Sequence, residues 1–416
     1  MSKKIKEFTK WTVLLVLTGI SAAIAASLMI FLIELIQGLS FGITHGSFDD
    51  QISYVNPIRR FFSVCLSGLL AAFGWHYLSK YLNPSPTITE IVHKDKEPKP
   101  SANFLHGLLQ MATVSMGSPL GREGASREAA VAITGSWLPF IKLDKNKSIL
   151  LLACASGAAL GAVYNAPLAT LIFIMENVLL SWSWKNAYAA SVTSFIAVGF
   201  VNLVFGSEIQ YKIQQLEWNT DLFIWSLISG CLLAIIIYTY KSLLESSPKK
   251  DPKSINYLIF VPLSFILVAI LSLYFPEILG NGKAGLIYYF NQPFSATYAF
   301  PLFLAKALAV YITFYAGAYG GRIAPSMMMG GALGLFTAQL SNMILHSHIP
   351  IQFAILIGAA LFLAIINNIP IAAVLFLLEI TGQPLINGIP VAMAMASAYL
   401  TIYFLKKFAP KKSRKV

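Results

Sequence analysis

Charged residues are scarce in this chain. Asp, Glu, Lys and Arg together make up 12% of its 416 residues, whereas hydrophobic residues make up 56%. A soluble domain carries about twice that share of charge, about 25%. Uncharged runs such as 11–32, 187–205, 222–240 and 255–274 are long enough to cross a hydrocarbon core about 30 Å thick. The deficit therefore excludes an ordinary soluble protein and predicts an all-α polytopic membrane protein.

Cysteines are few, and catalytic motifs are lacking. The three cysteines, Cys65, Cys154 and Cys231, lie far apart in apolar runs, where free cysteines behave as small hydrophobic residues. The sequence contains no HExxH, GxSxG or phosphate-binding loop motif, and His346 and His348 fall in a predicted loop without acidic partners. The sequence therefore lacks the residues that would form a metal site or the active site of a hydrolase or an ATP-driven pump. We expect neither enzymatic activity nor a cofactor.

The net charge of +12 comes from a few short basic segments. Because short basic loops mark the cytoplasmic side of a membrane protein, we expect a multi-pass protein of the plasma (inner) membrane with both termini in the cytoplasm. The more acidic segments 46–51 and 207–221 would then face outward. Basic patches of this kind bind anionic lipid headgroups of the bilayer, and their distribution argues against nucleic-acid binding. The basic segments are residues 1–10, 94–99, 249–253 and the tail 409–416.

The chain contains an internal repeat. The stretch "NAPLATLIFIME", which starts at Asn165, recurs as "NIPIAAVLFLLE", which starts at Asn368, with Asn, Pro, Phe and Glu in the same register. Runs of small residues precede both copies. The sequence therefore predicts two homologous membrane repeats, residues 11–205 and 222–408, joined by a linker at 206–221.

Both copies of the repeat are unusually short. Residues 167–180 and 370–380 are bounded by proline and by polar residues, and neither is long enough to span a bilayer comfortably. Short or broken helices in matching positions of two halves are typical of transporters built from inverted repeats, with a substrate site near the midplane. A polytopic membrane protein with a structural or enzymatic role is the alternative that this pattern disfavours.

Charged residues interrupt an apolar region in "MGSPLGREGASREAA", residues 116–130. Gly117, Pro119 and Gly121 break a helix, so we expect one to begin near Glu123. The free amides and the positive dipole end of a first helical turn bind anions. Glu123 at this place would act as a tethered anion, and protonating it would let a free anion through. Alternatively, Glu123 simply pairs with Arg122 or Arg127.

A second motif repeats this design. In "GGRIAPSMMMGG", residues 320–331, two glycines precede a helix that is expected to begin near Ile323, with Pro325 in its first turn. Two helix starts, one from each half, could then converge on one anion. Arg127 and Glu128 are interpreted as a buried ion pair, or as partners of the repeated glutamates, rather than as anion ligands.

With these motifs, the chain resembles the CLC family of chloride channels and transporters. "GREGAS" is similar to the GREGP motif of that family and "GRIAP" to its GxFxP motif, and the likeness spans roughly residues 10–405. It implies a homodimer in which each subunit has its own anion pathway, with Glu123 as the gating and proton-exchanging residue. It also implies anion contacts from Ser85, Gly121, Arg122, Gly124, Gly321, Arg322, Ile323 and Ala324.

The chain departs from the family pattern in several places. "NPSPTITE" replaces the family's GSGIP, with Ser85 as the best match for the hydroxyl donor and Thr87 as an alternative register. Glu176 and Asn177 occupy the proton-pathway positions, and Asn177 stands where the coupled antiporters carry an internal glutamate. An asparagine cannot relay a proton in the same way.

The C-terminal helix that carries a second anion-binding tyrosine in many members is missing from the pattern. Tyr399 or Tyr403 is the candidate substitute. Chloride is the expected anion, and fluoride/proton antiport is the alternative, because Asn177 and the short C-terminus resemble the fluoride-exporting branch. Whether the protein is a channel or exchanges the anion for protons stays open at this point.

Overall fold

The computed structural model describes residues 3–43, 47–82, 86–94, 96–247, 250–291 and 296–408. Within these ranges the chain is helical, and its only β-type pairing is an isolated antiparallel bridge between Gly121 and Gly321. The α-helices are α1 (Lys3–Phe41), α2 (Phe48–Gln51), α3 (Pro57–Tyr81), α4 (Ile88–His93), α5 (Pro100–Ser115), α6 (Glu123–Trp137), α7 (Lys145–Tyr164), α8 (Pro167–Phe173), α9 (Trp184–Phe205), α10 (Thr220–Ser246), α11 (Tyr257–Tyr274), α12 (Lys283–Asn291), α13 (Ala296–Tyr315), α14 (Ile323–Leu345), α15 (Ile351–Asn367), α16 (Pro370–Thr381) and α17 (Gly388–Phe408). Short 3-10 turns are η1 (Ile52–Tyr54), η2 (Leu138–Phe140), η4 (Pro276–Ile278) and η5 (Leu385–Asn387), and α8 continues as the π-helical turn η3 (Ile174–Val178).

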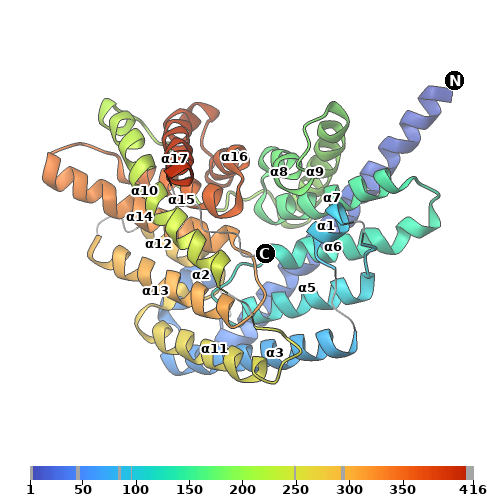
Figure 1. The fold of residues 1–416 in the computed structure, drawn as a ribbon, viewed down its shortest axis with the longest axis horizontal. Helices are drawn as coiled ribbons and strands as arrows, with labels where there is room; N and C mark the ends of the chain where they lie inside the picture. Colours follow the sequence, from blue (N-terminus) through green and yellow to red (C-terminus); the bar gives the residue numbers. More distant parts are fainter. Residues whose placement is uncertain are drawn as a thin grey trace.

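The helices form two lobes that correspond to the two halves of the sequence. In Figure 1, α5 to α9 lie on the right together with α1, whereas α10 and α12 to α17 lie on the left. The lobes meet where α3 packs on α11 and where α8 packs on α16. The predicted class, an all-α polytopic membrane protein with two repeats, is confirmed.

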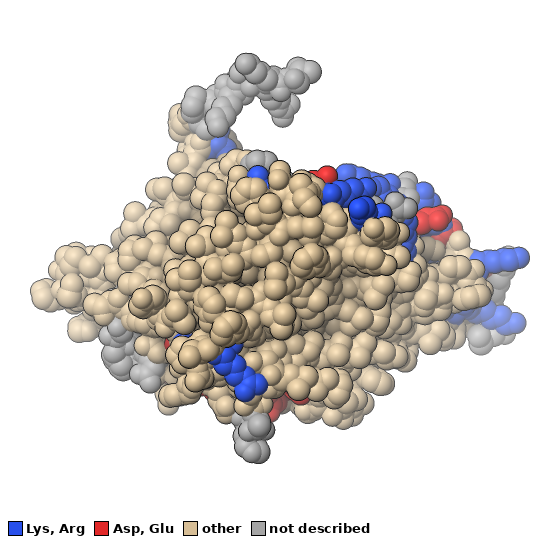
Figure 2. Space-filling view, turned by 90° about the horizontal axis from the view of Figure 1, so that it is seen from below, with Lys and Arg blue, Asp and Glu red and all other residues tan. Residues whose placement is uncertain are grey.

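Nine helices in the described part of the chain are long and apolar enough to cross a membrane. Many of their large apolar side chains are exposed, as on α3 and α10, which is expected where lipid rather than water is the solvent. Figure 2 shows a broad face with few charged residues, and Lys and Arg are gathered mainly toward one side of it. The predicted short helices are also present, because α8 with η3 (Pro167–Val178) and α16 (Pro370–Thr381) each have fewer residues than a spanning helix needs.

The two copies of the repeated motif fold in the same way. Helix α7 ends at Asn165 with φ 55°, and α15 ends at Asn368 with φ 56°. Asparagine tolerates this left-handed conformation better than most residues do. Two residues later, Pro167 and Pro370 open α8 and α16 at a position where proline loses no hydrogen bond. The same residues therefore stop one helix and start the next in both halves.

The repeated glutamates cap each other's helices. The carboxylate of Glu176 lies at the start of α16, and that of Glu379 lies at the start of α8, so each satisfies free amides of the other repeat. Each pair of bonds ties one half of the chain to the other. The bonds are Ile371 N to Glu176 Oε1 at 3.0 Å, Ala372 N to Glu176 Oε2 at 2.8 Å, Leu168 N to Glu379 Oε1 at 3.0 Å and Ala169 N to Glu379 Oε2 at 2.7 Å.

Candidate anion pathway

The two predicted helix starts lie side by side. Helix α6 begins at Glu123 and α14 begins at Ile323, as the sequence predicts. Gly121 N donates to Gly321 O at 2.7 Å, and Gly321 N donates to Gly121 O at 2.7 Å. Because this bridge is antiparallel, the two strands of chain that lead into the helices run in opposite directions, as an inverted pair requires.

The carboxylate of Glu123 lies between the two helix starts. Its side chain is buried, at 2% exposure, and its Oε1 accepts hydrogen bonds from the amide of Ala324 at 2.8 Å and from the hydroxyl of Tyr164 at 2.9 Å. Oε2 has no partner among the described residues. The alternative ion pair with Arg122 or Arg127 does not form among them, because Arg127 Nε bonds to the hydroxyl of Ser156 at 3.0 Å and Arg122 Nε has no partner.

Glycine is required on both sides of this carboxylate. A Cβ atom on Gly121 or on Gly321 would overlap Glu123 Oε2. A Cβ on Gly124 would meet the Gln110 amide at 2.7 Å, closer than van der Waals contact allows. The carboxylate therefore fills a small space lined by backbone, and that space faces the first turns of α6 and α14. A monatomic anion is of the size and charge that such a space accepts.

Arg122 connects this site to a polar cavity. The cavity has a volume of about 630 Å³ and is lined in part by Arg122. Residues from both acidic segments predicted to face outward also line it, which places those segments on the same side of the molecule. Lys283 reaches across it, 3.6 Å from Asp49 Oδ2 and 3.3 Å from Gln210 Oε1. Its polar lining includes Glu34, Gln37, Asp49, Asn165, Asn202, Glu208, Gln210 and Lys283.

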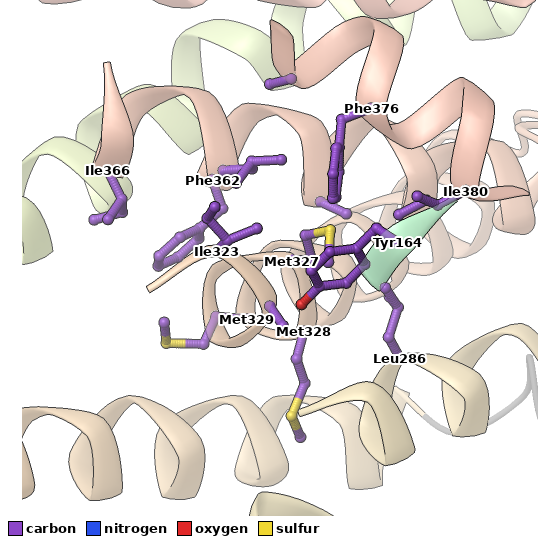
Figure 3. Close-up of a cluster of buried hydrophobic side chains, with 14 of the residues drawn as sticks. Tyr164, Leu286, Ile323, Met327, Met328, Met329, Phe362, Ile366, Phe376 and Ile380 are labelled. Carbon is purple, nitrogen blue, oxygen red and sulfur yellow. The ribbon is translucent and has the colours of Figure 1, made fainter. Parts of the chain in front are cut away.

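The side chains of Arg322 and Ile323, which follow the glycines of the second motif, have neighbours other than the Glu123 carboxylate. The Arg322 guanidinium stacks on Phe314 at 5.6 Å from the ring centre. Figure 3 shows Ile323 beside Phe362, and Phe376 above the ring of Tyr164. The two rings are 5.1 Å apart and meet edge to face. Within the second motif, the backbone amide of Ala324 donates to Glu123, and the other side chains pack around this contact.

Ser85 lies outside the described residues. Its alternative, Thr87, is exposed and caps α4, where its hydroxyl oxygen accepts from Glu90 N at 3.2 Å. The Glu90 carboxylate in turn accepts a hydrogen bond from Thr87 N and another from Lys96 Nζ at 2.7 Å. The hydrogen bond from the Lys96 ammonium, followed by the backbone bond, lowers the pKa of the Glu90 carboxyl. Thr87 therefore caps the start of α4, and its role as the alternative hydroxyl donor stays a prediction.

The two candidate C-terminal tyrosines have other neighbours than Glu123 in the structure. Tyr399 donates its hydroxyl to the carbonyl of Ala364 at 3.2 Å, and Tyr403 is 59% exposed and lies against Phe404. Neither shows a bond to Glu123, and a contact of either with the anion stays a prediction. The tyrosine that contacts Glu123 is Tyr164, which sequence reasoning missed. Its position at the end of a run of small residues was the available signal, because such runs let helices pack closely.

The remaining ionisable residues near the site also have other partners than predicted. Glu128 pairs with His106, with Glu128 Oε2 and His106 Nδ1 2.6 Å apart. Arg127 lies over the ring of Phe173 at 5.1 Å, so the predicted Arg127–Glu128 ion pair is wrong. Asn177 donates to the carbonyl of Asn367 at 3.1 Å. Glu176 uses both carboxylate oxygens on α16, and its place on a proton pathway stays a prediction.

Comparison with known proteins gives one consistent answer. The profile of the voltage gated chloride channel family matches residues 67–402. The voltage-gated ClC-type chloride channel ClcB of Escherichia coli O81 (strain ED1a) is 26% identical over 396 residues, covering 92% of this chain and 93% of its own. The corresponding ClcB of Salmonella typhi is 25% identical over 393 residues, covering 92% and 93%.

Solved structures share the fold at lower sequence identity. A slow cyanobacterial Cl−/H+ antiporter superposes with a TM-score of 0.81 at 17% identity, covering 95% of this chain and 94% of its own. A CLC-type fluoride/proton antiporter gives a TM-score of 0.75 at 17% identity, covering 96% of each chain. Since the family profile covers most of the sequence, this chain belongs to the voltage gated chloride channel (CLC) family.

Proposed function

We propose that this protein carries chloride across the plasma (inner) membrane and that the Glu123 carboxylate is its gate. The observation that carries the proposal is the hydrogen bond from Ala324 N to Glu123 Oε1 at 2.8 Å. It joins a carboxylate from one half of the chain to a helix start from the other half. The carboxylate thus holds, by a tether, the position that a free anion would occupy.

Protonation offers a simple way to empty that position. A charged carboxylate makes hydrogen bonds about twice as strong as a neutral acceptor does, so a protonated Glu123 is held less firmly by Ala324 and Tyr164. An anion can then replace it on the same amides. Oriented amides bind an ion strongly enough to admit it, and weakly enough to release it again. Exchange of one group for the other couples anion movement to proton movement.

The anion contacts follow from this geometry. The proposed anion contacts are backbone groups at the two helix starts, at Gly121, Arg122, Gly124, Gly321, Arg322, Ile323 and Ala324. The proposal is supported by the position of Gly121 and Gly321 against the Glu123 carboxylate and by the bond from Ala324 N. The Ser85 hydroxyl is proposed as a further donor, on the strength of its motif alone. Lys283 and Arg122, which line the polar cavity, would draw anions toward the gate from outside.

Chloride is the proposed anion because the relatives at about a quarter identity are named as chloride channels. Fluoride/proton antiport is the second candidate, favoured by Asn177 at the proton-pathway position and supported by the fold of the fluoride/proton antiporter. Both candidates require protons to reach Glu123.

A homodimer is proposed from the surface of α16 and α17. An apolar hollow of about 430 Å³ lies there, lined by Pro370, Ile371, Val374, Leu375, Ala392, Met395, Ala396 and Tyr399. Exposed apolar hollows of this size on a membrane protein suit a second protein surface as well as lipid. The basic termini of each subunit are proposed to lie in the cytoplasm, with residues 11–205 and 222–408 as the two repeats.

The test is anion efflux from proteoliposomes loaded with chloride or fluoride, with external pH recorded at the same time. We expect faster efflux of chloride and an opposite movement of protons. Glu123→Gln removes the ionisable group and keeps the shape, so proton movement should stop while anion flux continues. If proton movement survives in Glu123→Gln, the proposed gate is wrong. If fluoride leaves faster than chloride, the second candidate replaces the first.

A further inference from the structure

A second ionisable pair lies close to the gate and has no part in the function proposed so far. His106 on α5 and Glu128 on α6 are joined by a hydrogen bond of 2.6 Å between Nδ1 and Oε2. Their side chains are 15% and 17% exposed, so the pair is mostly buried, with a small part of each side chain at the surface. The second ring nitrogen, Nε2, has no hydrogen-bond partner among the described residues. We call these two residues the His–Glu pair.

The surroundings of the pair place it on the side predicted to be cytoplasmic. The His106 ring lies edge-on to Tyr319, with centres 4.6 Å apart, and 6.1 Å from Trp75 on α3. The next residue on α3, His76, bonds to the carbonyl of Pro252 at 2.7 Å, in the basic loop before α11. The other charged groups that act on this cluster are Arg127, next to Glu128 on α6, and Asp251, which acts on Tyr319.

A buried polar side chain on the same face of α5 as His106 contacts the turn that leads to the gate. Gln110 follows His106 by four residues on α5, so the two side chains lie on one face of that helix. Gln110 is 3% exposed, and its Nε2 donates to the carbonyl of Gly121 at 3.3 Å. Gly121 in turn lies against the Glu123 carboxylate. The helix face that carries His106 therefore also carries the side chain that contacts the turn before Glu123.

The proposed function requires protons to reach Glu123 from the cytoplasmic side, and the residue at the predicted internal position cannot carry them. Asn177 has an amide, which does not ionise, and its Nδ2 is engaged by the carbonyl of Asn367. Imidazole and carboxylate groups are the side chains that exchange protons near neutral pH. The His–Glu pair is a buried acid–base pair of this chemistry beside the turn that holds Glu123.

We propose that the His–Glu pair is the internal proton-loading site of this protein and supplies Glu123 in place of an internal glutamate. This inference rests on the proposed function. One proton enters the pair from the inner solution, and one leaves it for the Glu123 carboxylate, which returns the pair to its starting charge. Neutral Glu123 then gives up its place to one anion, and Gln110 acts as the positioning residue between pair and gate.

The test compares proton and anion movement in the same proteoliposomes for Glu128→Gln and for the unaltered protein. Glutamine keeps the shape and a hydrogen-bond partner for His106 but cannot ionise. We expect anion flux within about threefold of the unaltered protein and a proton-to-anion ratio at least about tenfold lower, which is a change of about 1.4 kcal/mol or more. Asp144→Asn is the matched control, because Asp144 is an exposed acid paired with Lys147 at 3.0 Å and should leave the ratio unchanged.

Each outcome decides the matter. An unchanged ratio in Glu128→Gln overturns the proton-loading role and leaves the proposed anion transport standing. If the unaltered protein moves anions without protons, the role is likewise overturned. If Glu128→Gln loses both fluxes, His106→Gln decides: loss of proton movement alone supports the proposal, and a retained ratio or loss of both fluxes overturns it. Absence of anion flux in the unaltered protein would instead refute the proposed function.

Discussion

Removing the hydroxyl of Tyr164 is the sharpest perturbation that the gate allows. Tyr164 is 1% exposed and donates to Glu123 Oε1 at 2.9 Å, while its ring is held edge to face by Phe376. Phenylalanine at this position keeps the ring contact and deletes one donor. The carboxylate would then be held by Ala324 N alone. Because the hydroxyl holds the charged form, its loss favours release of the carboxylate from the site.

The size of the effect follows from the contacts. A hydrogen bond to a charged group contributes about 1.5–3 kcal/mol, and each 1.4 kcal/mol changes an equilibrium about tenfold. Tyr164→Phe should therefore shift the ratio of released to held carboxylate by one to two orders of magnitude. If release of the carboxylate limits turnover, we expect anion efflux to rise by about tenfold. A larger shift in the ratio of released to held carboxylate would not raise efflux further, because another step would then limit turnover.

The assay is chloride efflux from proteoliposomes for Tyr164→Phe, Glu123→Gln and the double variant. With glutamine at position 123 the acceptor carries no charge, so adding Tyr164→Phe should change efflux by no more than about threefold. Tyr240→Phe is the matched control, because the Tyr240 hydroxyl donates at 2.9 Å to the carbonyl of Ala307 and not to the gate. An unchanged or slower efflux in folded Tyr164→Phe, or an equal rise in the Glu123→Gln background, would refute the reasoning.

Three further predictions concern the site and its supports. Gly321→Ala places a Cβ where the Glu123 carboxylate lies, and overfilling such a site costs about 1–3 kcal/mol. Anion affinity measured by titration calorimetry should therefore fall about 5- to 100-fold, and an unaltered affinity would show that the anion binds elsewhere. Glu379→Gln weakens the cap on α8 and should lower the free energy of unfolding by about 1–2 kcal/mol, seen as a lower thermal midpoint; an equal midpoint would make the cap dispensable. The pKa of Glu90 is lowered, chiefly by Lys96, so its stabilisation of α4 is present above the ordinary value of about 4.3 and is lost as pH falls through the lowered one; constant hydrogen-exchange protection of α4 across that window would contradict this.

Much of the fold could be predicted because it depends on local patterns in the sequence. Uncharged runs identify the spanning helices, since a bilayer accepts little else. The register shared by the two copies of the motif identifies the repeat, and the glycines before Glu123 and Ile323 mark where two helices begin. Each of these signals is a continuous stretch of sequence, or a comparison of two such stretches, in which spacing and propensity decide the outcome.

Partners of individual side chains could not be predicted in this way. Tyr164 and Glu123 lie far apart in sequence, and so do Glu379 and the amides of α8 that it caps. Sequence reasoning paired Arg127 with its neighbour Glu128, yet neighbours on a helix point in different directions. His106 is the partner instead because α5 packs on α6. A lone histidine in an apolar run carries no local sign of this.

The inverted arrangement explains why neither half could hold the site by itself. A helix start leaves free amides that an anion can satisfy, and at the starts of α8, α14 and α16 the carboxylate that does so belongs to the other half. Glu176 caps α16, Glu379 caps α8, and Glu123 accepts from Ala324. The first two are short fixed bonds at the ends of small helices, whereas Glu123 has one oxygen without a partner among the described residues. Of these three carboxylates, Glu123 alone is held through a single oxygen, so the same contact that forms a structural bond at two places is proposed to be movable at the third.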